Sequence, residues 1–247
     1  MTITVSVFGS CRVFTPVNKL ARRGLIQTAH RGIEWYTHTT RDALQKLKIV
    51  RNQLVIEAED VPLVAETHAK KWLPENHRKD VFDRTELFVI EACSRKIFAR
   101  NGIYYQQWCY QEAEKDPEAT GVSRERLAAT AQRQQSAAEI KGDMELLCQR
   151  LGRPVLFVGH MDVVLKNGKK IPDRGYVNKA MAEFCAGRQD AYYFDPLEQV
   201  KEYGAELALM DSSHYREEFM DTVGDKLLAA MNLLIAQRAV ESLAAAE

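Results

Sequence analysis

Four short apolar runs constrain the fold of this chain more than any other feature of its sequence. They are residues 3–8, 87–92, 155–158 and 191–195, and each has the length of a β-strand. The runs are mainly apolar rather than alternating, which is typical of parallel strands buried on both faces. Helical segments separate them. The sequence therefore predicts a three-layer α/β/α fold, with a mostly parallel sheet between two layers of helices.

Capping residues indicate where the helices begin and end. Thr39 or Thr40 precedes an amphipathic segment at 41–47, and Ser123 precedes a longer one that continues to Leu147, before Gly152. Further helices are expected near residues 178–186 and, as one or two segments, over 215–245. Neither an internal repeat nor a linker is visible, so residues 1–247 are predicted to form a single domain.

Composition and charge disfavour several classes of partner. The 34 basic and 34 acidic residues give a net charge of zero, so we expect no nucleic-acid partner. Because no apolar stretch approaches the length of a membrane span and no basic leader precedes the first strand, we expect no membrane partner and a cytoplasmic protein. The five cysteines include no C-x-x-C pair, which favours free thiols over a structural zinc or redox site.

The first candidate site combines residues from the two ends of the chain. Ser10 follows the first predicted strand, where a turn into a helix can project a hydroxyl beyond the sheet and aim backbone N–H groups at a developing oxyanion. Asp211 and His214 are three residues apart, so the carboxylate can hold the imidazole as a base for Ser10. The structural alternative is a capping Ser10 with Asp211 and His214 on the surface at a helix start.

These residues carry a resemblance to a known family. Gly9-Ser10 after an N-terminal strand, with a late Asp-x-x-His and a closing helix, resembles the SGNH (GDSL-like) hydrolases. The resemblance implies a flavodoxin-like sheet, no cofactor and no metal, with Ser10 as nucleophile, His214 as general base and Asp211 as its orienting partner. Gly9-Ser10-Cys11 is also similar to the glycan-modifying branches of that superfamily, some of which are acyltransferases.

The oxyanion hole matches that family less well. The segment before the helix at 41–47 resembles its second block but lacks the glycine, so the resemblance assigns the amide donor to Thr37 or His38. Ser94 stands where the family has an asparagine, and its hydroxyl can also donate a hydrogen bond to an oxyanion. Loss of a preorganised donor is worth about 3 kcal/mol of transition-state stabilisation.

Basic residues follow the predicted strand ends. Arg12, Arg95 and Lys96 are placed to face the site, where they would favour an anionic substrate or a phosphate-bearing acyl carrier. Salt bridges with neighbouring acids are an equal alternative.

A second motif suggests a different chemistry. Gly-His160-x-Asp162-Val-Val after a strand resembles the first metal block of the aminoacylase and carboxypeptidase class of zinc peptidases. A catalytic zinc needs at least three protein ligands, and the acidic pair of that class is missing. We therefore interpret His160 and Asp162 as residues at the rim of the serine site, with His160 in contact with substrate.

The sequence thus predicts a serine esterase or deacylase that forms an acyl-enzyme on a small-molecule or glycan acyl ester. Three alternatives remain open: an O-acyltransferase acting on a glycan or small hydroxyl compound, a non-catalytic binding protein with the SGNH fold, and the zinc peptidase-like enzyme. The oligomeric state is also open, with a homo-oligomer among the alternatives.

Overall fold

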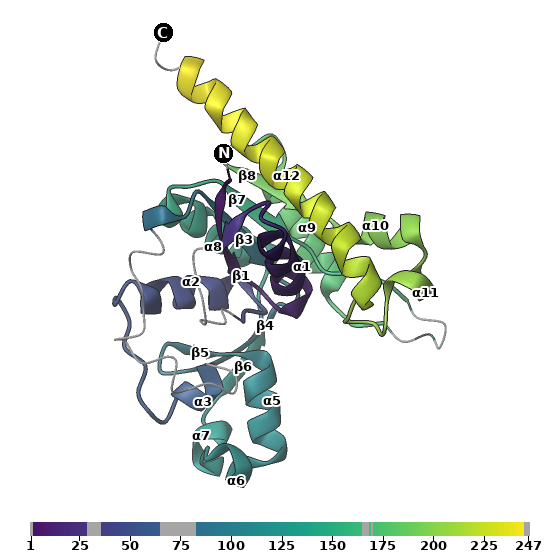
Figure 1. The fold of residues 1–247 in the computed structure, drawn as a ribbon. Helices are drawn as coiled ribbons and strands as arrows, with labels where there is room; N and C mark the ends of the chain where they lie inside the picture. Colours follow the sequence, from purple (N-terminus) through teal and green to yellow (C-terminus); the bar gives the residue numbers. More distant parts are fainter. Residues whose placement is uncertain (1, 29–35, 65–82, 165–167, 169, 245–247) are drawn as a thin grey trace.

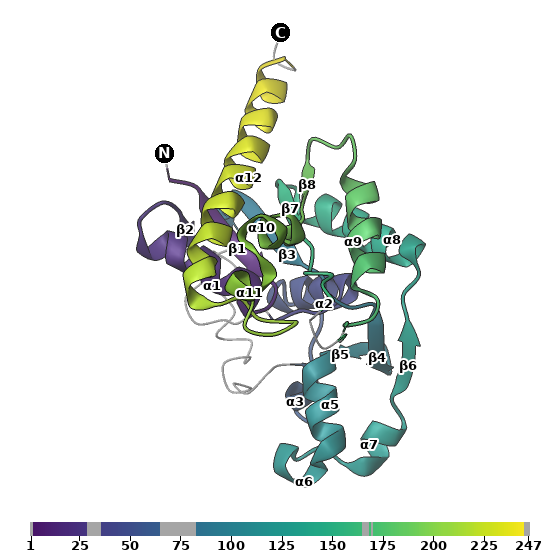
Figure 2. The same cartoon turned by 90° about the vertical axis from the view of Figure 1, so that its right-hand side faces the viewer.

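A five-stranded parallel sheet forms the centre of the molecule (Figures 1 and 2). The computed structural model describes residues 2–28, 36–64, 83–164, 168 and 170–244. Along the sheet the order is β2-β1-β3-β7-β8, and every neighbouring pair is parallel. This is the flavodoxin-like order, in which the chain reverses direction across the sheet between β1 and β3. The strands are β1 (Thr4–Phe8), β2 (Gln27–Thr28), β3 (Leu87–Glu91), β7 (Val155–Val158) and β8 (Ala191–Phe194).

Helices cover both faces of this sheet. Because successive residues of a strand point to opposite sides, each strand contributes apolar side chains to both faces. Val89 packs into one apolar cluster, and its neighbours Phe88 and Ile90 pack into the other. The first cluster lies under α1 (Cys11–Arg22), α10 (Pro196–Tyr203), α11 (Ala205–Ala208) and α12 (Glu217–Ala244). The second lies under α2 (Thr40–Val50), α8 (Ala137–Leu151) and α9 (Arg174–Cys185). The predicted three-layer α/β/α fold with a mostly parallel sheet is confirmed.

A smaller antiparallel sheet lies beside the main one, in the lower part of Figure 1. Its order is β5-β4-β6, and its apolar cluster includes Phe98 stacked on Tyr110 at 4.4 Å between ring centroids. The sequence did not predict this sheet. Its strands are β4 (Lys96–Arg100), β5 (Ile103–Tyr105) and β6 (Ala131–Gln134), and its helices are α3 (Val61–Val64), α5 (Gln107–Lys115), α6 (Pro117–Thr120) and α7 (Arg124–Ala128).

The prediction of one long helix after Ser123 is wrong, because part of that segment forms a strand of the smaller sheet. Ser123 caps α7, but the chain then extends to pair β6 with β4. Ser136 begins α8 with its own capping box, in which Glu139 hydrogen-bonds back to the backbone N–H of Ser136. The apolar spacing from Leu127 to Leu147 therefore spans two helices and a strand, because pairing with β4 overrides the local helical pattern.

Capping and close packing place the candidate site at the reversal point of the sheet. Ser10 caps α1 directly beyond β1, and Glu91 ends the neighbouring β3. Gly9 permits this contact, because a Cβ at that position would lie 3.0 Å from the Cβ of Glu91.

Across the described part of the chain, none of the helices has both the length and the apolar content needed to cross a bilayer.

The long helix α12 gives a test of the packing. Leu227 is fully buried in the first cluster, whereas Leu233 on the same helix is 46% exposed. We expect Leu227→Ala to lower the free energy of unfolding by about 2–5 kcal/mol, because it leaves a cavity under the helix. Leu233→Ala should change it by less than about 0.5 kcal/mol. Urea unfolding of the two variants measures both values, and equal losses would contradict this packing.

Candidate active site

Ser10 is buried and already hydrogen-bonded. Its side chain and backbone N–H both donate to Oε2 of Glu91, at 2.6 Å from Oγ and 2.7 Å from the backbone nitrogen. The Oγ atom also accepts a long 3.4 Å hydrogen bond from the N–H of Arg12, which is the helix cap. With 3% of Ser10 exposed, its hydroxyl is held against a carboxylate at the start of α1.

Glu91 links the start of α1 to the end of β3. Its second carboxylate oxygen pairs with Nε of Arg12 at 2.8 Å, and its side chain is 1% exposed. Burial alone would lower the pKa of Arg12, but the charge of Glu91 and its hydrogen bond, together with the nearby cysteines, raise it. Arg12 and Glu91 therefore form a buried ion pair beneath the site.

Arg12 also reaches the C-terminal loop of the predicted triad. Its Nη1 donates to the carbonyl of Ser213 at 3.1 Å, between residues 201 positions apart in the sequence. The loop that carries Asp211 and His214 therefore lies beside the start of α1. The two remote parts of the chain on which the predicted triad depends are neighbours.

Asp211 and His214 contact each other on that loop. Nδ1 of His214 lies 2.8 Å from Oδ2 of Asp211, whose other oxygen accepts the backbone N–H groups of Ser213 and His214. Burial would raise the pKa of Asp211, but these hydrogen bonds lower it. Because the carboxylate holds Nδ1–H, the Nε2 atom of His214 is the one left to exchange a proton.

The triad is not assembled by direct contact. Both Ser10 and His214 are within the described chain, and no hydrogen bond joins them. Ser10 faces Glu91, while the side chains of His214 and Asp211 are 47% and 50% exposed. The structure thus brings their elements together and leaves the hydroxyl and the imidazole apart.

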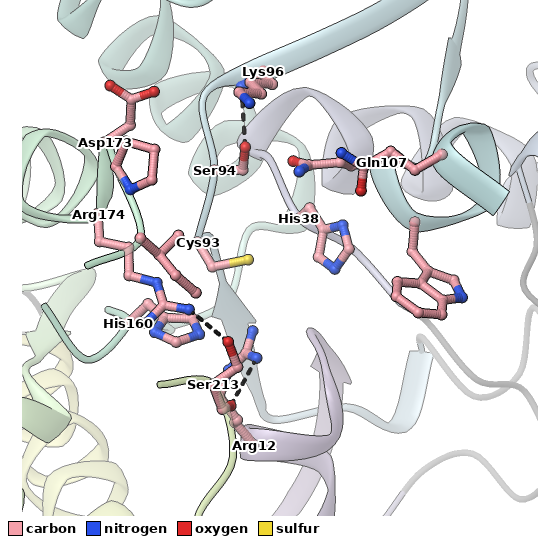
Figure 3. Close-up of a pocket in the computed structure, with 14 residues that line it drawn as sticks. Arg12, His38, Cys93, Ser94, Lys96, Gln107, His160, Asp173, Arg174 and Ser213 are labelled. Atoms are coloured by element: carbon pink, nitrogen blue, oxygen red, sulfur yellow. Dashed lines mark hydrogen bonds between the residues drawn. The ribbon is translucent and has the colours of Figure 1, made fainter. Parts of the chain in front are cut away.

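A pocket opens above this network, beyond the carboxyl ends of β1, β3 and β7. Its volume is about 210 Å³, and Figure 3 shows Arg12, Arg174, His160 and Ser213 at one side and His38 at the other. Of the three predicted triad residues, all of which the structure describes, none is among the lining residues. The lining includes Arg12, His38, Cys93, Ser94, His160 and Arg174.

The predicted oxyanion donors differ in what they have left to donate. The N–H of His38 donates to Asp42 at 3.1 Å as part of the α2 cap, and the Thr37 hydroxyl donates to the carbonyl of Glu91 at 3.4 Å. Ser94 lines the pocket, and its Oγ accepts the N–H of Lys96 at 3.1 Å. Its hydroxyl proton therefore remains to be donated into the pocket, whereas Thr37, whose backbone N–H is the predicted donor, is not among the lining residues.

Two histidines enter the pocket as neutral imidazoles. Burial, followed by the positive charge of Arg12, lowers the pKa of His38 to about 4 and that of His160 well below its ordinary value. His160 is 1% exposed, and its backbone is clamped by Asn178, which accepts its N–H and donates to its carbonyl. Its Nδ1 lies 3.4 Å from the carbonyl of Met161, which can only accept a hydrogen bond.

Arg174 is the least expected residue of the pocket. It is 3% exposed and donates to the carbonyls of Met161 and Ser212 and to the hydroxyl of Ser213. No carboxylate of the described chain forms an ion pair with it within 4.0 Å. Burial and the nearby charge of Arg12 lower its pKa to about 10, so it still carries its charge at neutral pH.

The remaining predicted contacts are occupied elsewhere or incomplete. Nε of Arg95 pairs with Asp173 at 3.0 Å, and its guanidinium stacks on a tyrosine ring, whereas Lys96 lines the pocket. Asp162 pairs with Lys170 at 3.1 Å. Among the residues that the structure describes there is no cluster of three histidine, cysteine, aspartate or glutamate side chains. A zinc site at His160 and Asp162 would therefore lack a third ligand there.

Sequence reasoning missed Glu91, Cys93 and Arg174. Glu91 had a signal, because a single charge ends an otherwise apolar run that must be buried. Cys93 lines the pocket, but burial raises its pKa to about 12, so the thiol stays protonated at neutral pH. Arg174 had no such signal, because its partners come from loops elsewhere in the sequence.

Comparisons with known proteins find sequence similarity to one protein family and to one curated protein of the same name. A family model described as the TviD N-terminal domain matches residues 3–121 and 110–230. The Vi polysaccharide biosynthesis protein TviD of Salmonella typhi is 23% identical over 262 aligned positions, covering 92% of this chain and 31% of that protein. The chain therefore spans about a third of the length of this curated relative.

The buried ion pair gives the next prediction. Glu91→Gln should lower the free energy of unfolding by about 3–5 kcal/mol, because it leaves the charge of Arg12 buried without its partner. Glu145→Gln, which removes a carboxylate from the partly exposed pair with Arg188, should cost less than about 1 kcal/mol. Urea unfolding at pH 7.5 compares them, and a Glu91 variant as stable as the Glu145 variant would contradict a structural role for the pair.

The buried imidazole of His160 predicts a pH dependence. Its folded pKa lies below the unfolded value of about 6.5, so the unfolded chain binds the extra proton and stability falls as the pH drops below about 6.5. His160→Leu should remove up to about 1.4 kcal/mol per pH unit of this slope between pH 6.5 and 5. Asp42, whose pKa burial raises to about 6, titrates in both proteins and cancels in the comparison. Urea unfolding from pH 7.5 to 5 tests this, and identical slopes would exclude it.

Proposed function

The chain belongs to the TviD N-terminal domain family, and from this premise we propose that it is an enzyme that transfers or removes O-acyl groups on a glycan, with Ser10 as its nucleophile. The name of the relative refers to biosynthesis of a polysaccharide, which supports a glycan substrate and favours acyl transfer over hydrolysis. Because the chain corresponds to 31% of that relative, the activity of the whole relative is not carried over.

One observation carries the proposal. Arg12, two positions after the candidate nucleophile Ser10, donates a hydrogen bond to Ser213. This bond holds the loop of Asp211 and His214 against the start of α1. In a flavodoxin-like sheet this reversal point is where ligands bind. A hydroxyl, an imidazole oriented by a carboxylate and a polar pocket at one such point suit nucleophilic acyl transfer.

The proposed reaction has two half-steps. Oγ of Ser10 attacks the acyl carbonyl as its proton passes to Nε2 of His214, and the imidazolium then protonates the departing alkoxide to leave an acyl-enzyme. In the second half-step an acceptor hydroxyl gives its proton to Nε2 of His214 and attacks the acyl carbon. The bond between the acyl carbon and Oγ breaks, and the imidazolium returns the proton to Oγ, which regenerates Ser10. When the acceptor is a glycan hydroxyl the result is transfer, and when it is water the result is hydrolysis.

In the structure Ser10 and His214 contact other residues, so both side chains must change position before the proposed reaction. Ser10 must release Oε2 of Glu91, and the exposed His214 must turn towards it from the loop. Glu91 is a positioning residue in this scheme, because it holds Ser10 and Arg12 at the start of α1. The free hydroxyl proton of Ser94 is the proposed oxyanion donor from the pocket wall.

A non-catalytic binding protein is the second candidate. The observation that favours it is the buried Ser10 hydroxyl, which already donates to Glu91 and has no contact with the described His214. A protein of this kind would keep the pocket and its charges without using the serine.

Ser10 variants decide between the two candidates. We expect a fluorophosphonate to label the wild-type protein at Ser10, and Ser10→Ala to abolish labelling and lower turnover of an aryl acetate by about a thousandfold or more. Ser136→Ala is the matched control, because Ser136 is also a helix-capping serine but belongs to α8. Peptide mapping of the labelled protein locates the adduct.

The outcome of this test is unambiguous when folding is checked by circular dichroism. A wild-type protein that neither reacts with the probe nor turns over an ester supports the binding protein. Unchanged turnover in Ser10→Ala would instead show that the ester is cleaved without Ser10, which contradicts the proposed nucleophile. Mass analysis of products with an added oligosaccharide then separates transfer from hydrolysis.

A further inference from the structure

The pocket contains a buried charge for which the residues that the structure describes supply no ion-pair partner. Arg12 is neutralised by Glu91, and Arg95 by Asp173, but Arg174 is met only by two carbonyls and one hydroxyl of the described chain. Removing a guanidinium from water without an anion is costly, and buried charges in proteins are ordinarily paired. Arg174 is therefore in the state expected of a residue whose anion arrives with a ligand.

His160 supplies a second incomplete contact in the same pocket. Its Nδ1 faces the carbonyl of Met161, so Nδ1 carries the ring proton and Nε2 is left as an acceptor. That Nε2 atom is buried and has no hydrogen-bond partner within the described segments. A neutral imidazole acceptor fits a hydroxyl donor, whereas a carboxylate or phosphate oxygen would be repelled by the lone pair of Nε2.

The two residues are held in place by one carbonyl. Nη1 of Arg174 donates to the carbonyl of Met161 at 2.9 Å, and Nδ1 of His160 faces the same oxygen. Asn178, one turn along α9 from Arg174, fixes the backbone of His160. The cation and the acceptor are therefore presented together by α9 and the loop after β7, on the wall shown in Figure 3.

We propose that this pocket binds a hydroxylated anion, with Arg174 holding a carboxylate or phosphate group and Nε2 of His160 accepting a hydrogen bond from a neighbouring hydroxyl. The identification of the ligand as a sugar rests on the proposed function, whereas the anion site rests on the contacts of Arg174. A sugar carboxylate would belong to the glycan, and a phosphate to an activated donor. A volume of about 210 Å³ accommodates one such unit.

Binding of four small probes to the full chain tests the proposal at constant ionic strength. Calorimetric titration compares glucuronate, glucose 1-phosphate, neutral glucose and acetate. We expect at least one anionic sugar to bind tenfold or more tightly than glucose, because a charge-assisted contact is worth roughly tenfold to a hundredfold in affinity. Preference for glucuronate identifies a carboxylate-bearing glycan, and preference for glucose 1-phosphate identifies a donor.

Two variants separate the contacts. Arg174→Gln should weaken binding of the preferred anionic sugar by about tenfold or more. Lys179→Gln, which removes a charge from an exposed position of α9, should leave it unchanged. His160→Leu should weaken the anionic sugar but leave acetate unaffected, since acetate has no hydroxyl. A purely structural role for His160 predicts the same affinity for both ligands in the wild type and the variant.

Two results would contradict the proposed ligand site. The proposal fails if neither anionic sugar binds more tightly than glucose to the wild-type protein, a measurement that needs no variant to fold. It also fails if Arg174→Gln, with a wild-type melting temperature, binds the anionic sugar as the wild type does. Because binding requires no turnover, loss of the Ser10 mechanism with binding intact would refute the proposed function alone.

Discussion

The buried carboxylate of Glu91 is the constraint on which the rest of the site depends. It ends a central strand where a charge is costly, and it is compensated by the hydroxyl and N–H of Ser10 and by Arg12. These donors occupy the first turn of α1, so the carboxylate fixes the entry of that helix against β3. Arg12 then extends the same network to the C-terminal loop through Ser213.

The sheet order explains why these groups meet. The helix α1, which follows β1, and the helix α8, which leads the chain from the smaller sheet back to β7, cover opposite faces of the sheet, and a crevice is expected between the ends of β1 and β3. Ser10 and Glu91 lie at its base, and the pocket with Arg174 and His160 lies beyond β7. Two chemistries are therefore adjacent: a serine held by a carboxylate, and a cationic wall suited to an anion. The proposed acyl chemistry uses the first, and the proposed ligand site uses the second.

Much of the fold could be predicted because the signals are local. The apolar runs at β1, β3, β7 and β8 each lie within one short segment, and the Thr39 cap marks the start of α2. The strand β6 could not be predicted, since residues 131–134 are polar and become a strand only by pairing with β4. The SGNH resemblance and the triad stay predictions, because Ser10 and His214, both within the described residues, do not form a hydrogen bond with each other.

By itself, the sequence determined the parallel α/β architecture and the candidate residues Ser10, Asp211 and His214, because strand pattern and residue type are properties of short segments. Only the tertiary structure decided which side chains meet: Ser10 with Glu91 rather than His214, and Arg174 with the carbonyls around His160. Hydrogen bonding of the site joins segments as far as 201 positions apart in the chain, as in the contact between Arg12 and Ser213. No local pattern encodes which of these partners will compensate a buried charge.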